Sequence, residues 1–199
     1  MPRGPLEDVP GAKDALRRRL LEARRGLRPA ELAAGARAVC DGLLGTPEVA
    51  GARVVGAYVS VGQEPGTGPL LDALLDRGTE VLLPVLLPDG DLDWAVHEGD
   101  AALRPATRGL LEPAGPRLGP GAVTRAGAVL VPGLAVDRRG VRLGRGGGSY
   151  DRALARVAGR AFTCVLLHDG EVLDLPVPRD RHDVPVAAAV TPGGVLRFR

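Results

Sequence analysis

A glycine-rich stretch between an apolar run and a helical pattern is the part of the chain whose residue types most clearly suggest chemistry. The run at 126–134 predicts a buried strand, and the pattern at 150–158 predicts a helix. Between them stand Gly144, Gly146, Gly147 and Gly148. Glycine lets backbone N–H groups approach a ligand closely, and the start of a helix carries partial positive charge. The stretch therefore predicts a cradle for phosphate groups.

Charged residues flank the same glycines. Arg142 and Arg145 can each offer phosphate oxygens a planar, permanently charged fork of donors. Asp151, in the first turn of the predicted helix, can hold the Mg²⁺ that accompanies a nucleotide. Each feature also has an ordinary structural explanation, as a flexible loop, a solvated arginine or a partner of the helix dipole. Their coincidence within ten positions favours the nucleotide site.

Two familiar phosphate-binding loops do not match. A Walker A loop ends in Gly-Lys-Ser or Gly-Lys-Thr, which the chain lacks. A G-x-G-x-x-G fingerprint that starts at Gly144 would need glycine where the chain has Ser149. The chain therefore carries a different kind of cradle.

A second basic element lies near the N-terminus. Lys13 and Arg17 are four positions apart on a helix predicted at 12–26, so both cations flank its apolar stripe. Lys13 is also the only lysine among the 26 basic residues of the chain. From the residues alone, a solvated basic face and a ligand contact both stay open.

The string around the glycines resembles the signature of the 5-formyltetrahydrofolate cyclo-ligase family, also called 5,10-methenyltetrahydrofolate synthetase. The matching residues are Pro132 to Asp137, Gly140, Arg142 to Gly148 and Tyr150 to Arg152. Weaker similarity runs from Lys13 to Thr191 and includes His182 with Asp183. By this resemblance the chain is identified as a member of the family.

The resemblance implies residues for ATP, for the folate substrate and for a metal ion. Those implied for ATP are Lys13, Arg17, Arg142, Leu143, Gly144, Arg145, Gly146, Gly147, Gly148, Ser149 and Tyr150. Those implied for the substrate are Val59, Glu64, Arg145, Gly146, Gly147, Gly148 and Ser149. Asp151 and Asp183 are implied as ligands of Mg²⁺, which takes carboxylate and phosphate oxygens.

Glu64 is the residue that most directly favours a folate. Its counterpart in the family faces the pterin, whose amino group and ring N–H form a donor pair that a carboxylate can accept in a fork. The alternative is that Glu64 caps a helix predicted at 69–77.

The implied reaction is the ATP- and Mg²⁺-dependent closure of 5-formyltetrahydrofolate to 5,10-methenyltetrahydrofolate, through a phosphorylated formyl group and with release of ADP and phosphate. Ser149 in place of a family tyrosine, Ala187 in place of an acidic residue and a longer loop before His182 depart from the pattern. Two alternatives stay open. One is a nucleotide or folate sensor without turnover, and the other is an ATP-dependent enzyme of the same fold that acts on another substrate.

The elements that must position these residues alternate between helical and extended patterns. Apolar runs predict strands at 52–61, 80–86, 92–97, 126–134 and 161–167, and periodic patterns predict helices at 12–26, 29–44, 69–77 and 150–158. This alternation favours parallel strand pairing. The resemblance implies an α/β fold, a three-layer α/β/α sandwich with a mostly parallel sheet.

Length and composition fit one soluble domain spanning residues 1–199, with residues 1–11 as a flexible extension. The net charge of +2 gives no reason to expect nucleic acid or a membrane as a partner. Cys40 and Cys164 lack the spacing of a disulfide framework or a zinc motif. We therefore expect a cytoplasmic monomer that binds reduced folate and ATP.

Overall fold

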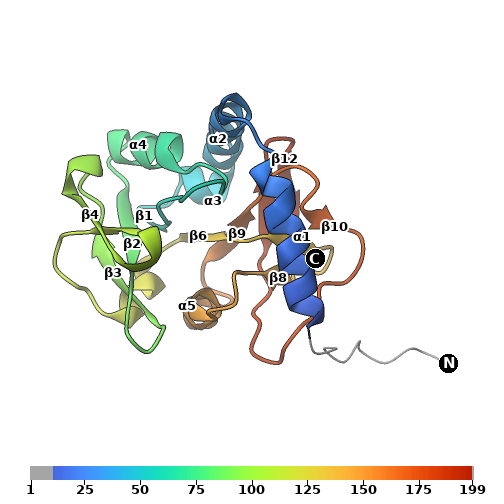
Figure 1. The fold of residues 1–199 in the computed structure, drawn as a ribbon. Helices are drawn as coiled ribbons and strands as arrows, with labels where there is room; N and C mark the ends of the chain where they lie inside the picture. The colour runs from blue at the N-terminus through green and yellow to red at the C-terminus, as the bar shows by residue number, and fades with distance from the viewer. Residues whose placement is uncertain (1–10, 199) are drawn as a thin grey trace.

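The computed structural model describes residues 11–198, which form an α/β fold around a seven-stranded sheet (Figure 1). The helices are α1 (Ala12–Arg25), α2 (Pro29–Leu44), α3 (Pro47–Ala50), α4 (Gly68–Asp76) and α5 (Ser149–Val157), with 3-10 turns η1 (Asp100–Ala102), η2 (Thr107–Gly109) and η3 (Pro120–Arg125). The large sheet contains β1 (Val54–Gly56), β2 (Glu80–Leu86), β3 (Leu92–Val96), β6 (Ala128–Pro132), β9 (Phe162–Leu166), β11 (Ala188–Thr191) and β12 (Gly194–Arg197). Of the extension predicted at 1–11, only residue 11 lies within the described part.

The large sheet is mostly parallel, as predicted. Its order is β12-β11-β9-β6-β1-β2-β3, and all pairs are parallel except those made by the two edge strands, β12 and β3. The expectation of parallel pairing is wrong for β3. A turn at 87–91 joins β2 to β3, whereas a parallel crossover needs a dozen or more residues.

Each face of the sheet is covered by its own helices, which confirms the three-layer arrangement. In β6, Leu130 packs in one cluster with residues of α2 and α4, whereas Val129 and Val131 pack in another cluster with residues of α5. Figure 1 shows α2, α3 and α4 on one side of the sheet and α5 on the other. Because the central strands are buried on both faces, they read as nearly continuous apolar runs in the sequence.

The strand predicted at 52–61 is shorter in the structure, where β1 ends at Gly56. Beyond it, the loop at 60–67 is closed by Ser60 and Thr67. The Ser60 N–H donates to Thr67 Oγ1 at 2.9 Å, and the Thr67 N–H donates to Ser60 Oγ at 3.1 Å. This closed loop carries Glu64, so hydrogen bonds within the loop replace the expected strand.

A small sheet beside the main one was not predicted. It consists of β10 (Val172–Leu173), β7 (Ala135–Asp137) and β8 (Arg142–Leu143), while β4 (Leu103–Pro105) and β5 (Leu111–Pro113) form a separate pair. Helix α1 packs on the small sheet through Leu20, which clusters with Leu134 and Leu143. Among the residues that the structure describes, no helix combines the length and the apolar character needed to cross a membrane.

Candidate active site

The glycine loop at 144–148 connects β8 to α5. Gly146 and Gly148 have φ angles of +109° and +67°, a left-handed conformation that is strained for residues with a side chain. Gly148 is the N-cap of α5, so the positive end of the helix dipole begins at the loop. Arg17 Nε donates to the Gly144 carbonyl at 3.0 Å and thereby ties α1 to the loop. Positive-φ glycines followed by the start of a helix are features that phosphate-binding loops share.

A cavity of about 340 Å³ opens beside this loop. Residues from distant parts of the sequence line it, and nearly all of the predicted site residues are among them. These are Lys13, Arg17, Glu64, Arg142, Leu143, Gly144, Arg145, Gly146, Gly147, Gly148, Ser149, Tyr150, Asp151 and Asp183. The structure therefore brings the residues predicted for nucleotide, folate and metal to one cavity.

Val59 is the predicted site residue that the structure does not bring to the cavity. It packs against the core cluster of α2 and α4, whereas Val61 lines the cavity. The physical reason is that the chain has already left β1 at this point, so the alternation of a strand no longer decides which side chains face the ligand.

Arg142 is held inside the protein. Its Nη2 donates to Asp151 Oδ1 at 3.0 Å, its Nη1 donates to the Pro132 carbonyl at 3.2 Å, and its side chain is 4% exposed. The sequence predicts a donor to phosphate at this position. In the structure, its terminal nitrogens instead hold Asp151 at the edge of the cavity.

Lys13 extends from α1 to a loop near the C-terminus. Its ammonium donates to Asp180 Oδ2 and to Asp183 Oδ2, both at 2.7 Å. The Asp180 N–H also donates to Asp183 Oδ2 at 2.8 Å, which fixes the two acids relative to each other. The ion pair shows that Lys13 is not on a solvated face. Asp180 was not predicted as a site residue, because its place beside Lys13 depends on the fold.

Two carboxylates and one imidazole lie close enough together to share a divalent cation. Asp180, His182 and Asp183 each offer one ligand atom, and these atoms lie within 4.8 Å of one another. Asp151 lies beside the same segment, because its Oδ1 accepts a hydrogen bond from the Val184 N–H at 3.3 Å. Carboxylate oxygens are the protein ligands that Mg²⁺ prefers, so the donor set suits the predicted ion.

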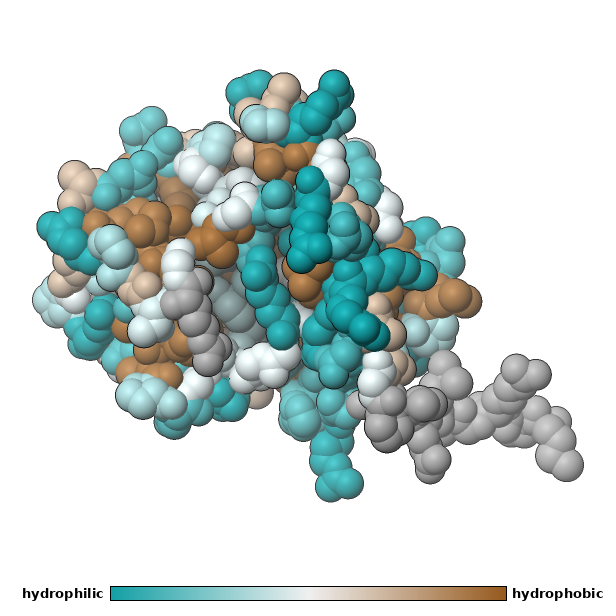
Figure 2. All heavy atoms as spheres, in the orientation of Figure 1, coloured by the Kyte–Doolittle hydropathy of each residue, from teal (hydrophilic) through white to brown (hydrophobic). Residues whose placement is uncertain are grey.

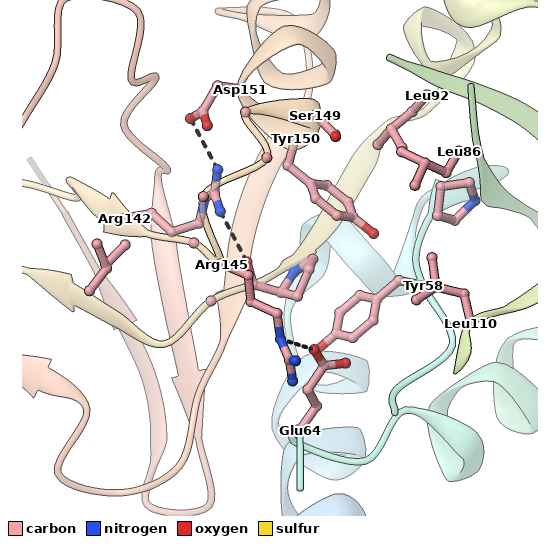
Figure 3. Close-up of a pocket in the computed structure, with 18 of the residues that line it drawn as sticks. Tyr58, Glu64, Leu86, Leu92, Leu110, Arg142, Arg145, Ser149, Tyr150 and Asp151 are labelled. Atoms are coloured by element: carbon pink, nitrogen blue, oxygen red, sulfur yellow. Dashed lines mark hydrogen bonds and ion pairs between the residues drawn. The ribbon is translucent and has the colours of Figure 1, made fainter. Parts of the chain in front are cut away.

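Glu64 is buried and faces the glycine loop. Its Oε1 forms an ion pair with Arg145 Nε at 3.1 Å, and its Oε2 accepts from the Val61 N–H at 3.0 Å (Figure 3). Thr67 is the N-cap of α4, and that helix has no side-chain cap. Glu64 therefore does not cap the helix, and the alternative considered for it is wrong.

Two tyrosines stand at the centre of the cavity. Burial raises the pKa of Tyr58 and of Tyr150, and the nearby charge of Glu64 raises both further. Figure 3 shows the Tyr58 ring directed toward Glu64 and the Tyr150 ring extending from α5 into the same cavity. Both phenols are therefore neutral groups that can donate hydrogen bonds and present ring faces to a flat ligand.

An apolar wall completes the cavity on the side of β2, β3 and β5. It consists of Pro84, Leu86, Leu92, Leu110 and Leu111. The Leu86 N–H donates to Glu112 Oε1 at 3.0 Å, and this hydrogen bond attaches β5 to β2. Figure 2 shows hydrophilic side chains gathered along α1 and hydrophobic ones in the region of β2 and β4. Nothing in the sequence indicated that leucines from three strands would meet in this wall.

Comparisons with known proteins show which family the chain is similar to. Residues 9–192 match the model of the 5-formyltetrahydrofolate cyclo-ligase family. A 5-formyltetrahydrofolate cyclo-ligase of Mycolicibacterium smegmatis is 41% identical over 96% of this chain and 99% of its own length. The enzyme of that name from Escherichia coli strain K12 is 29% identical over 88% of this chain and 97% of its own length.

Solved structures are similar over the same range. The 5,10-methenyltetrahydrofolate synthetase of Aquifex aeolicus superposes with a TM-score of 0.80 at 30% identity, covering 94% of this chain and 93% of that one. A synthetase of Mycoplasma pneumoniae, at 16% identity and a TM-score of 0.72 over 91% of this chain and 99% of that one, shares the fold. Because residues 9–192 match the family model, this chain belongs to the 5-formyltetrahydrofolate cyclo-ligase family.

Proposed function

We propose that this enzyme closes 5-formyltetrahydrofolate to 5,10-methenyltetrahydrofolate and uses ATP and Mg²⁺ to do so. The observation that carries the proposal is the cavity in which Glu64 and the glycine loop face each other, joined by the ion pair between Glu64 and Arg145. A folate held by Glu64 and a nucleotide held by the loop would then lie side by side. Family membership and the relatives' names support the same reaction.

The nucleotide would bind at the glycine loop. Backbone N–H groups of the loop and the start of α5 favour phosphate oxygens. Arg17 and Lys13 add positive charge from α1, and both line the cavity. Asp151 and Asp183, with Asp180 bonded to Asp183, would hold Mg²⁺. When bound, this ion would neutralise the negative charge of the phosphates during transfer of the phosphoryl group.

The chemistry would take place between the two substrates. The formyl oxygen attacks the γ-phosphorus and ADP leaves. N10 of the folate then attacks the activated formyl carbon, loses its proton and expels phosphate. Holding the reacting atoms in line accounts for roughly 7–11 kcal/mol in well-oriented reactions. Positioning is the main contribution that the side chains would make.

A protein nucleophile is not needed in this scheme. Cys40 and Cys164 are buried free thiols outside the cavity lining, and burial raises the pKa of Cys164. Neither thiol is placed or activated for attack.

Absorbance at the long-wavelength band of the methenyl product provides the test. We expect this band to appear when the enzyme, 5-formyltetrahydrofolate and Mg-ATP are mixed, and to be abolished by excess EDTA. Binding of both ligands without the band would favour a sensor. ATP hydrolysis that other formylated or acidic compounds stimulate more strongly would favour a different substrate. Product formation in excess EDTA would contradict the metal assignment.

We extend the proposal to the cellular setting. The enzyme would act in the cytoplasm as a monomeric single domain, with reduced folate and ATP as its small-molecule partners. Size-exclusion chromatography with light scattering checks the oligomeric state.

A further inference from the structure

The hydroxyl of Tyr58 is buried and has no hydrogen-bond partner among the described residues. The side chain is 3% exposed and lines the cavity. The other buried side-chain groups without a partner are Arg24 Nη1, Trp94 Nε1, both ring nitrogens of His97, and Arg142 Nε. Of these, only Arg142 also lines the cavity, and its two terminal nitrogens are already bonded. Tyr58 is therefore the cavity residue whose one polar group is entirely unsatisfied.

An unsatisfied hydroxyl at this position needs an explanation. Phenylalanine would fill the same space without withdrawing a polar group from water, so the hydroxyl of Tyr58 lowers the stability of the protein unless something binds it. Burial and the charge of Glu64 raise the pKa of the phenol, so the hydroxyl keeps its proton and acts as a donor. A bound ligand is the partner that the cavity can supply.

The surroundings of Tyr58 indicate which part of a ligand would meet it. Figure 3 shows the ring directed from the end of β1 toward the Glu64 carboxylate. The Glu64 oxygens accept from Val61 and pair with Arg145, and neither bonds to Tyr58. Each carboxylate oxygen has two lone pairs, so Glu64 keeps capacity for ligand donors. The phenol thus adds a donor beside a strong acceptor.

We propose that Tyr58 contacts the substrate directly, as a specificity residue that donates a hydrogen bond to the ring carbonyl of the pterin. This inference rests on the proposed function and on Glu64 as the pterin contact. Along that edge of a pterin, an amino group and a ring N–H are followed by a carbonyl oxygen. Glu64 accepts from the two donors, and Tyr58 satisfies the acceptor next to them. Together they read one donor-donor-acceptor edge.

The test compares Tyr58→Phe with the wild-type enzyme by calorimetric titration and by steady-state kinetics. We expect the Kd and KM for 5-formyltetrahydrofolate to rise roughly tenfold, the scale for losing one such bond in a buried site. Binding of a non-hydrolysable Mg-ATP analogue should not change. The melting temperature of Tyr58→Phe should equal or exceed that of the wild type, because the variant removes an unsatisfied group. A hydroxyl with a purely structural role would give the opposite result, a lower melting temperature with unchanged folate affinity.

A double-mutant cycle with Glu64→Gln tests whether the two residues read one edge. We expect the two affinity losses to be non-additive, because each variant disturbs the pose that the other residue needs. Tyr150→Phe is the matched control, since it removes the other phenol of the cavity, and its loss should not couple to Glu64→Gln. Unchanged folate affinity in Tyr58→Phe, or losses that add with Glu64→Gln, would overturn the inference. If the wild-type enzyme itself forms no methenyl product, the proposed function has failed instead.

Discussion

Lys13 places one ammonium group between two carboxylates, those of Asp180 and Asp183. Burial by itself would lower the pKa of Lys13. The hydrogen bonds to the two acids outweigh this effect, and the net pKa is raised. The ammonium therefore stays charged at any physiological pH. It draws the end of α1 and the C-terminal loop together at the side of the cavity where phosphates would lie.

The first prediction replaces this cation. Lys13→Met removes the ammonium that pairs with Asp180 and Asp183, and it removes the proposed phosphate contact, so we expect the KM for ATP to rise about tenfold or more. Lys13→Arg keeps the charge but presents a wider planar fork, so it should bind ATP and turn over slowly. Steady-state kinetics at saturating 5-formyltetrahydrofolate provides the measurement. If Lys13→Met has the same KM for ATP and the same kcat as the wild type, Lys13 does not contact the nucleotide and α1 has only a structural role.

At the scale of elements, α1 extends from the buried Arg24 to the cavity, where it presents the charged side chains of Lys13 and Arg17. Lys13, Arg17, Leu20 and Arg24 lie on one stripe of the helix, at spacings of three and four residues. The buried end of the stripe is Arg24, which donates to both oxygens of Glu171 at 2.7 and 2.8 Å and to the Gly133 carbonyl at 2.7 Å. This anchor sets where the other end of the helix lies.

The second prediction concerns the ion pair between Arg24 and Glu171. Arg24→Met leaves Glu171 buried without its charge partner, and we expect a loss of about 3–5 kcal/mol in unfolding free energy. Adding Glu171→Leu removes the stranded charge, so the double variant should recover part of that loss. Urea denaturation measures both effects. Equal stability of the wild type and Arg24→Met would show that the ion pair does not anchor the helix.

At the scale of the whole molecule, Asp137 connects the small sheet to the loop that follows it. It accepts hydrogen bonds from Arg139 and from the N–H groups of Val141 and Val177. Burial by itself would raise the pKa of Asp137, but these hydrogen bonds outweigh it and lower the net pKa. The unfolded chain therefore takes up the proton more readily than the native protein does.

The third prediction follows from the lowered pKa of Asp137 in the folded protein. The stability that Asp137 provides is complete above its unfolded pKa, about 3.9, and is lost as the pH falls through the lower native value. Asp137→Asn should be less stable than the wild type at pH 7, and the difference should shrink as the pH falls below about 4. Denaturant titrations from pH 7 to pH 3 check this. A difference that stays constant over that range would contradict the assignment.

The sequence by itself determined the features that depend on near neighbours in the chain. The glycines before α5, the Lys13 and Arg17 pair on α1 and the apolar runs of the central strands are local patterns. These patterns can be read from a short stretch of sequence, because glycine conformation, the spacing of residues along a helix and the apolar character of a buried strand each involve only a few consecutive residues. The family resemblance rested on the same short strings.

The tertiary structure decided which of these residues meet. It turned Arg142 toward Asp151, joined Lys13 to Asp180, and placed Val61 instead of Val59 at the cavity. It also supplied Tyr58 and the leucine wall. These contacts join segments far apart in the sequence, such as Lys13 and Asp183, which lie 170 positions apart. No local propensity contains that information, because the contact depends on the packing of α1 on the small sheet, which brings Lys13 beside Asp183.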